Sequence, residues 1–217
     1  MGTGGAYTVN RAAALSGVPK SMVYRWAREG ILVPTVARDP MLWSYTDLLG
    51  LRAIYWLRQT KKAFDREVPV VSMPKIQRAL GELKRVNMDL LSKGRLVIAV
   101  TLLGEVAVGT GPLYSDQLDL VGPFEGLEGT RGPDLAWPRP TVQMLPRKLS
   151  GAPHVAGTRV PTESLCALFA RGFTVDQVAE IYPFVERESL RDSLILEEQL
   201  KRNCLRKTAY LDIAVPR

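Results

Sequence analysis

Residues 17–30 read Gly-Val-Pro-Lys-Ser-Met-Val-Tyr-Arg-Trp-Ala-Arg-Glu-Gly, and they decide how the first third of the chain folds. Gly17 suits a turn that requires a positive φ, and Gly30 is placed to end a helix. Between them, Met22, Val23 and Trp26 recur at helical spacing and form one apolar stripe. The opposite face of the predicted helix carries basic, hydroxyl and aromatic side chains, namely Lys20, Ser21, Tyr24, Arg25 and Arg28. A helix with these two faces fits the major groove of DNA.

The residues on either side predict further helices and a β-hairpin. Thr8 can cap a preceding helix whose buried face includes Val9, Ala12 and Ala13. An Arg38-Asp39-Pro40 turn between two short apolar stretches predicts a wing-like hairpin. Thr46 is expected to cap the next helix, whose inner side carries five apolar residues, Leu48, Leu51, Ile54, Tyr55 and Leu57.

The stretch from Tyr7 to Gln59 resembles the MerR-like or excisionase-like winged helix-turn-helix family. The matching residues are Tyr7-Thr-Val, Ala13, Gly17-Val18, Ser21, Val23-Tyr-Arg-Trp, Gly30-Ile-Leu, Pro34 and Tyr45-Thr-Asp-Leu48. The resemblance implies base contacts from the outer face of the second helix and further contacts from the wing. With the exposed Arg28 added, the expected DNA-binding residues are Lys20, Ser21, Tyr24, Arg25, Arg28, Arg38 and Trp43.

Positive charge is concentrated in residues 1–66. This segment holds ten basic and four acidic residues, which gives +6 of the formal net charge of +7. Such asymmetry predicts contact with a polyanion such as nucleic acid, because neutralised phosphates release counterions. A basic surface that only aids solubility is the alternative.

Composition divides the rest of the chain into four parts. Residues 67–108 are expected to form a connector made of a helix (74–86) and an apolar, β-rich hairpin (96–108). The hairpin is either covered by the core or exposed as a partner surface. Residues 109–148 are expected to form a mobile loop, because eleven of residues 109–140 are Gly or Pro. Residues 149–203 return to helical periodicity, and residues 204–217 form a tail.

Three helices are predicted within residues 149–203. Thr162 is expected to cap the first, a Thr174–Gln177 capping box opens the second, and the third runs over residues 186–202. The third helix has nearly balanced charge, which suits a protein-interaction or dimerisation module better than a second DNA reader. Arg159 is expected to anchor the loop before these helices, with a direct binding role as the alternative, and His154 is expected to pack or bond locally.

The same region closely resembles the domain-of-unknown-function family four-three-three, found in VapB-type antitoxins. The matching residues are Gly157-Thr158-Arg159, Pro161, Gly172, Val178, Tyr182-Pro183 and Leu190. The resemblance implies a PIN-domain ribonuclease toxin as partner, whose active site gathers carboxylates around Mg²⁺. A cationic segment could compete there, and the cationic candidates are Arg202, Arg206 and Lys207, with Tyr210 and Leu211 as apolar anchors. The alternative is a tail packed on its own domain.

The sequence predicts a protein that is mainly α with small β-hairpins (α+β): an N-terminal winged helix-turn-helix, a β-rich middle and a C-terminal three-helix unit. A single histidine and scattered carboxylates predict no enzyme, and no cofactor or metal site is expected. We expect a cytoplasmic homodimeric antitoxin that binds operator DNA and neutralises a PIN-domain toxin. The alternatives are a stand-alone regulator that dimerises through its C-terminal domain, and an adaptor without a nucleic-acid role. No membrane partner is expected.

Overall fold

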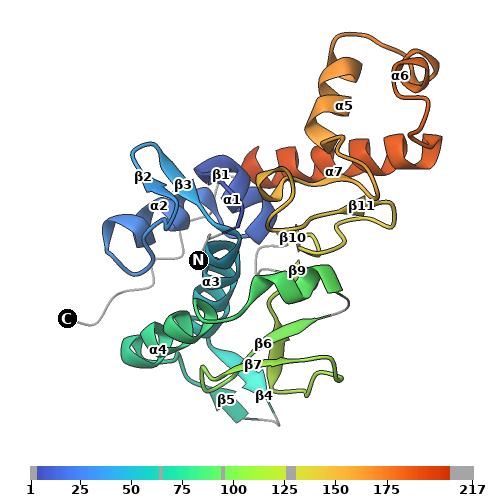
Figure 1. Ribbon diagram of the computed structural model, residues 1–217. Coiled ribbons are helices and arrows are strands. Elements are labelled where there is room, and N and C mark those ends of the chain that lie inside the picture. The colour runs from blue at the N-terminus through green and yellow to red at the C-terminus, as the bar shows by residue number, and fades with distance from the viewer. Residues whose placement is uncertain (1–3, 64–65, 94–95, 126–130, 206–217) are drawn as a thin grey trace.

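The computed structural model describes residues 4–63, 66–93, 96–125 and 131–205, and it combines helices with short antiparallel strands, as the predicted α+β class requires (Figure 1). The first elements are β1 (Tyr7–Thr8), α1 (Val9–Ser16), α2 (Lys20–Arg28), β2 (Ala37–Arg38), β3 (Met41–Trp43), α3 (Tyr45–Leu57), β4 (Lys61–Ala63), β5 (Arg66–Val68) and α4 (Met73–Leu83). After a 3-10 helix (Met88–Lys93) come β6 (Val97–Thr101), β7 (Val106–Gly109), β8 (Gln117–Asp119), β9 (Phe124–Glu125), β10 (Arg131–Gly132) and β11 (Val142–Gln143). A second 3-10 helix (Leu149–Gly151) precedes β12 (His154–Val155), α5 (Thr162–Ala170), α6 (Val175–Ile181) and α7 (Arg187–Leu205).

The two helices at the N-terminus begin and end at the predicted residues. The Thr8 hydroxyl accepts a hydrogen bond from the Arg11 backbone N–H and caps α1. Gly17, at φ 73°, makes the left-handed turn between α1 and α2. Gly30, at φ 68°, follows α2, and the Ile31 N–H returns to the Trp26 carbonyl oxygen. Glycine is required at both positions because side chains strongly disfavour a positive φ.

The predicted hairpin is present, and it belongs to a three-stranded sheet in the order β1-β3-β2. Helix α3 follows directly but is capped by Ser44, so the expected cap at Thr46 was wrong. Ser44 and Asp47 bond each other's backbone N–H groups in a capping box. Most residues of α3 are buried, which makes it the central helix of the molecule.

Residues 109–148 were expected to form a mobile loop, and the structure corrects this prediction. Strand β8 pairs with β6, β9 with β10, and β11 with β12. Buried apolar residues in and beside these strands belong to the same core as α1 and α3, namely Leu120, Val121, Phe124, Leu135, Val142 and Met144. Several of the described Gly and Pro residues lie between strands of two or three residues, which are too short to show a period.

The side chain of Arg52, on α3, holds this segment in place. It is completely buried and donates hydrogen bonds to backbone carbonyl oxygens of two segments. The acceptors are Leu15 and Ser16 in α1, and Leu120, Val121, Gly122 and Pro133 in the segment around β9 and β10. Arg52 therefore does not belong to the cationic surface to which the sequence analysis assigned its charge.

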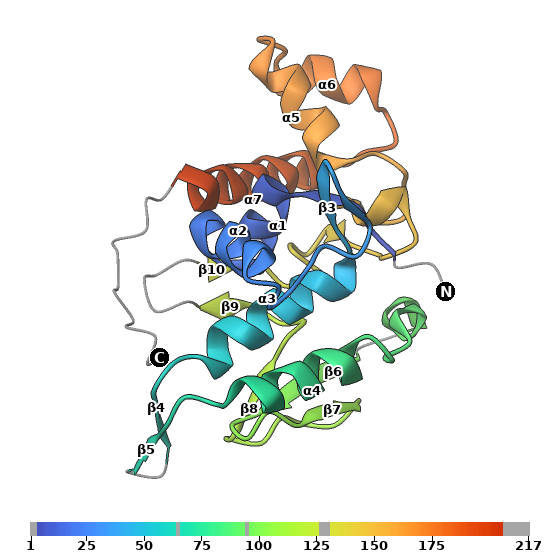
Figure 2. The same cartoon turned by 90° about the vertical axis from the view of Figure 1, so that its left-hand side faces the viewer.

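The middle sheet has the order β7-β6-β8, and its hairpin was predicted correctly. Ile98 and Val100 are buried in the main core, whereas Val108 near the end of β7 is half exposed. Helix α4 packs against α3 and lies over this sheet (Figure 2). Of the two alternatives for the hairpin, β6 follows the first, because its side chains Ile98 and Val100 are covered by the core.

The C-terminal helices are joined to the N-terminal ones. Val155, Val160, Leu165, Val178, Val185 and Leu190 form a small separate core under α5 and α6. Farther along α7, Leu196 and Leu200 enter the main core, and α7 lies against α1. Residues 149–203 are thus not packed as an independent unit, because one long helix belongs to both cores.

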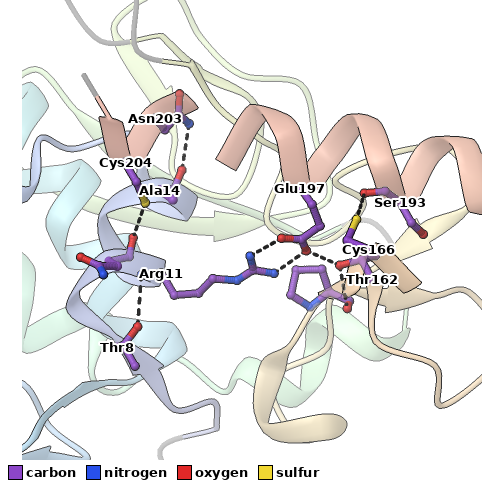
Figure 3. A network of polar contacts seen from close by, with 11 residues as sticks. Thr8, Arg11, Ala14, Thr162, Cys166, Ser193, Glu197, Asn203 and Cys204 are labelled. Atoms are coloured by element: carbon purple, nitrogen blue, oxygen red, sulfur yellow. Dashed lines mark hydrogen bonds and ion pairs between the residues drawn. The ribbon is translucent and has the colours of Figure 1, made fainter. Parts of the chain in front are cut away.

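Polar contacts fasten α7 to α1 (Figure 3). Arg11 donates two hydrogen bonds to the Glu197 carboxylate, which also accepts one from the Thr162 hydroxyl. The expected cap at Thr162 was therefore wrong: α5 is preceded by Pro161, and Thr162 reaches α7 instead. Near the end of α7, Asn203 donates to the Ala14 carbonyl oxygen.

Candidate nucleic-acid interface

The outward face of α2 is exposed in the described part of the chain. Val23 and Trp26 are 0% and 1% exposed, which fixes the orientation of the helix. The five candidate residues on the opposite side, Lys20, Ser21, Tyr24, Arg25 and Arg28, are all exposed. The structure therefore brings these predicted residues together on one face of a nine-residue helix.

Contacts within this face leave its cations in different states. The Lys20 ammonium lies 5.8 Å from the centroid of the Tyr24 ring, which is a cation–π distance. The Arg25 guanidinium forms an ion pair of 2.8 Å with Glu29, one turn further along α2. Arg28 has no hydrogen-bond or ion-pair partner within the described part of the chain. The Arg28 guanidinium can therefore bind an anion directly, whereas the Arg25 guanidinium can do so only after its ion pair with Glu29 is broken.

The two wing residues have different fates. Arg38 is exposed at the end of β2, next to the turn of the hairpin. Trp43 is completely buried, because its position in β3 pairs with Tyr7 and turns its side chain into the core. The expected DNA contact of Trp43 was therefore wrong, and Arg38 remains as the wing residue.

The sequence analysis missed the contribution of α4. Four of its exposed residues, or residues directly after it, are cationic: Lys75, Arg78, Lys84 and Arg85. The Gln77 side chain donates to the Ile31 carbonyl oxygen and ties α4 to the loop after α2. Lys84 lies across a shallow hollow from the wing residues 33–38. The helical spacing of these cations opposite Ile76, Leu80 and Leu83 could have revealed them.

These elements share one side of the molecule. Figures 1 and 2 show α2, the β2–β3 hairpin and α4 on the side that faces the viewer in Figure 2. We call the exposed cations of α2, β2 and the α4 segment, taken together, the basic face: Lys20, Arg25, Arg28, Arg38, Lys75, Arg78, Lys84 and Arg85. Their arrangement suits a ligand with many phosphates. One helix of the protein could contact the bases of such a ligand while the flanking cations contact its phosphate backbone.

The C-terminal candidates are only partly described. Arg202 is exposed near the end of α7, whereas Arg206, Lys207, Tyr210 and Leu211 lie outside the described residues. Arg159 is exposed, and its side chain has no hydrogen-bond partner among the described residues, so the expected anchoring role was wrong. His154 is buried, as expected, and its Nδ1 lies 2.9 Å from the Ala152 carbonyl oxygen.

Among the described residues, no group of three or more His, Cys, Asp or Glu side chains is arranged to hold a metal ion. None of the described helices combines the length and apolar character needed to span a bilayer.

Two comparisons with known proteins gave a match. Residues 142–195, from β11 into α7, match the model of a family described as protein of unknown function (DUF433). An uncharacterised protein, y4eO, from Sinorhizobium fredii (strain NBRC 101917 / NGR234) is 37% identical over 81 residues. That match covers 37% of this chain and 36% of the relative, so the chain spans about a third of its length. No solved structure gave a significant match.

Proposed function

We propose that the protein binds duplex DNA through α2 and represses its own operon. The observation that carries this proposal is the outward face of α2, where three cations and an aromatic ring are exposed opposite a buried stripe. The order of a helix, a turn, a second helix, a hairpin and a third helix supports a winged helix-turn-helix of the MerR-like kind. In this proposal Lys20, Ser21, Tyr24, Arg25 and Arg28 enter the major groove, and Arg38 and the α4 cations contact phosphates.

Fluorescence anisotropy tests the DNA-binding proposal. A duplex from the promoter of the protein's own gene and a random duplex of equal length are titrated at several salt concentrations. Arg28→Ala is expected to weaken binding to the promoter duplex about tenfold, because each such contact contributes about 1–3 kcal/mol. Arg171→Ala, which removes an exposed arginine after α5, is the matched control. Equal binding by both variants and the original protein would contradict the proposal.

We further propose that the protein is a VapB-type antitoxin that neutralises a PIN-domain ribonuclease. The resemblance of residues 149–190 to a family found in such antitoxins supports this role. The family-model match concerns the same region and carries no function of its own. Arg202 is the described part of the proposed toxin-binding segment. In this role the protein acts by binding, and its cations compete with the toxin's metal and RNA.

Co-expression with the protein encoded by the adjacent gene tests the antitoxin role. A PIN-domain neighbour is expected to co-purify with the full chain and to lose its ribonuclease activity in the complex. Arg202→Glu is expected to restore ribonuclease activity, whereas Arg191→Glu, a reversal of another exposed arginine on α7, leaves inhibition intact. A neighbour of a different kind, with DNA binding retained, would favour the stand-alone regulator.

A further inference from the structure

One stripe of α7 is seated on α1, the helix that precedes α2. Leu196, Leu200 and Asn203 recur at the four- and three-residue spacing of a single helical face. Leu196 and Leu200 are buried in the same core as α1. The Asn203 side-chain amide donates a hydrogen bond of 3.0 Å to the Ala14 carbonyl oxygen (Figure 3). A polar side chain of α7 therefore reaches the C-terminal end of α1.

The Ala14 carbonyl group has no donor within α1 or the turn that follows it. The last four carbonyl groups of an α-helix lack intrahelical partners, and α1 ends at Ser16. The N–H group of Val18, four residues after Ala14, bonds the Ser16 hydroxyl instead. The next residue, Pro19, has no N–H group. Because Ala14 is only 1% exposed, water has little access to its carbonyl group, and Asn203 supplies the donor.

The two carbonyl groups after Ala14 are bonded from another helix. Arg52 of α3 donates to the carbonyl oxygens of Leu15 and Ser16. Gly17 then turns the chain at φ 73°, and α2 begins at Lys20. The end of α1 is thus held by side chains of α3 and α7 directly before the turn into α2. How these side chains hold α1 therefore sets the direction in which α2 leaves the turn.

We infer that Asn203 is a positioning residue of the proposed DNA-binding helix, and that α7 completes the helix-turn-helix unit. The inference rests on the proposed DNA binding and adds to it a residue far outside the predicted DNA-binding domain, residues 1–66. Asn203 acts through the Ala14 carbonyl group and the turn at Gly17, and it does not itself contact DNA.

The orientation of α2 matters most for contacts with bases. Hydrogen bonds to base edges weaken steeply when donor and acceptor are misaligned, so a small rotation of α2 in the major groove disrupts them. Phosphate contacts made by long cationic side chains depend mainly on charge and tolerate such a rotation. Loss of the Asn203 hydrogen bond is therefore expected to lower affinity for the preferred sequence, whereas non-specific binding by the basic face persists.

Fluorescence anisotropy with the promoter duplex and the random duplex tests the inference, at a temperature where circular dichroism shows each variant to be folded. Asn203→Ala is expected to lower affinity for the promoter duplex about tenfold and affinity for the random duplex less than twofold. Leu190→Ala is the control for a general loss of stability, because Leu190 is buried in the separate core under α5 and α6. This control is expected to keep the original ratio of the two affinities.

Hydrogen exchange tests the positioning role without DNA. Amide exchange over residues 20–28 is expected to become at least fivefold faster in Asn203→Ala and to stay unchanged in Leu190→Ala. If the original protein shows no preference for the promoter duplex, the DNA-binding proposal fails, and exchange alone decides whether Asn203 holds α2. Unchanged exchange in Asn203→Ala, an unchanged ratio of affinities, or an equal effect of Leu190→Ala would each overturn the inference.

Discussion

Arg11 of α1 and Glu197 of α7 are joined by two hydrogen bonds of 2.6 and 2.7 Å, although 186 residues separate them in the chain. The Arg11 and Glu197 side chains are only 21% and 12% exposed, so water screens the pair weakly. Burial opposes the charged form of Arg11, but the Glu197 carboxylate outweighs it and the pKa of Arg11 is raised. Together with the hydrogen bond from the Thr162 hydroxyl to Glu197, this pair joins α1, which precedes the proposed DNA-binding helix α2, to α5 and α7.

Removal of one partner of this pair is expected to destabilise the protein. Glu197→Gln leaves the largely buried Arg11 without its counter-ion, and we expect the free energy of unfolding to fall by about 2–3 kcal/mol. Urea denaturation measures the change. Glu198→Gln, at the exposed neighbouring position, is the control and is expected to change stability by less than about 0.5 kcal/mol. A loss of the same size in both variants would show that the pair contributes nothing specific.

Replacement of Arg52 is expected to cost more. Burial lowers the pKa of Arg52 to about 10, yet the guanidinium still bonds carbonyl oxygens from both segments that it joins. Lysine has fewer donors and leaves several buried acceptors unpaired, so Arg52→Lys is expected to lower stability by about 3–5 kcal/mol. Arg85→Lys, at an exposed position, is the matched control. If Arg52→Lys unfolds at the same urea concentration as that control, the assigned role is wrong.

Two buried tyrosines predict sensitivity to alkaline pH. Burial raises the pKa of Tyr7, whose hydroxyl donates to the Gly151 carbonyl oxygen, and of Tyr45, whose hydroxyl donates to that of Leu135. The unfolded chain releases these protons near pH 10, whereas the folded protein retains them. Stability contributed by the two hydroxyls is therefore full below pH 10 and falls as the pH rises above it.

Equilibrium unfolding between neutral pH and pH 11 checks this prediction. The Tyr7→Phe variant is expected to be less stable at neutral pH but to lose less stability on the alkaline side. Tyr114→Phe, at a residue that is 71% exposed, is the control. A Tyr7→Phe curve that runs parallel to the original at all pH values would refute the assignment.

The Arg25–Glu29 pair predicts a limit on DNA binding. Glu29 occupies the Arg25 guanidinium and adds a negative charge beside the proposed groove-binding face. If α2 binds DNA, Glu29→Gln is expected to increase affinity for a random duplex more than for the promoter duplex, by about two- to fivefold at low salt. Glu163→Gln, at an exposed position on α5, is the control. Unchanged binding to the random duplex would show that Glu29 does not restrain Arg25.

Local signals predicted the N-terminal elements well. The cap at Thr8, the turn at Gly17 and the end of α2 at Gly30 each depend on residues within one helical turn. The apolar stripe of α2 also defined its exposed face. The cap of α3 was misplaced by two residues, although Ser44 and Asp47 already have capping-box spacing in the sequence.

Contacts between distant residues were the part that the sequence could not supply. Trp43 was expected in the wing, but pairing with Tyr7 turns it inward. Arg52 counted as a surface cation because its carbonyl partners come from other segments. The strands between residues 109 and 148 are too short for periodicity to show. They become evident only from the strands with which they pair elsewhere in the same chain.

The position of α7 across α1 also sets the order in which the molecule can be completed. A ribosome makes α1 and α2 well before Leu196, Glu197 and Leu200, which lie on the helix that packs against α1. The nascent helices α1 and α2 therefore keep one side uncovered until α7 has been made. A product cut short before α7 would contain every residue of the basic face and yet lack the helix that packs against α1.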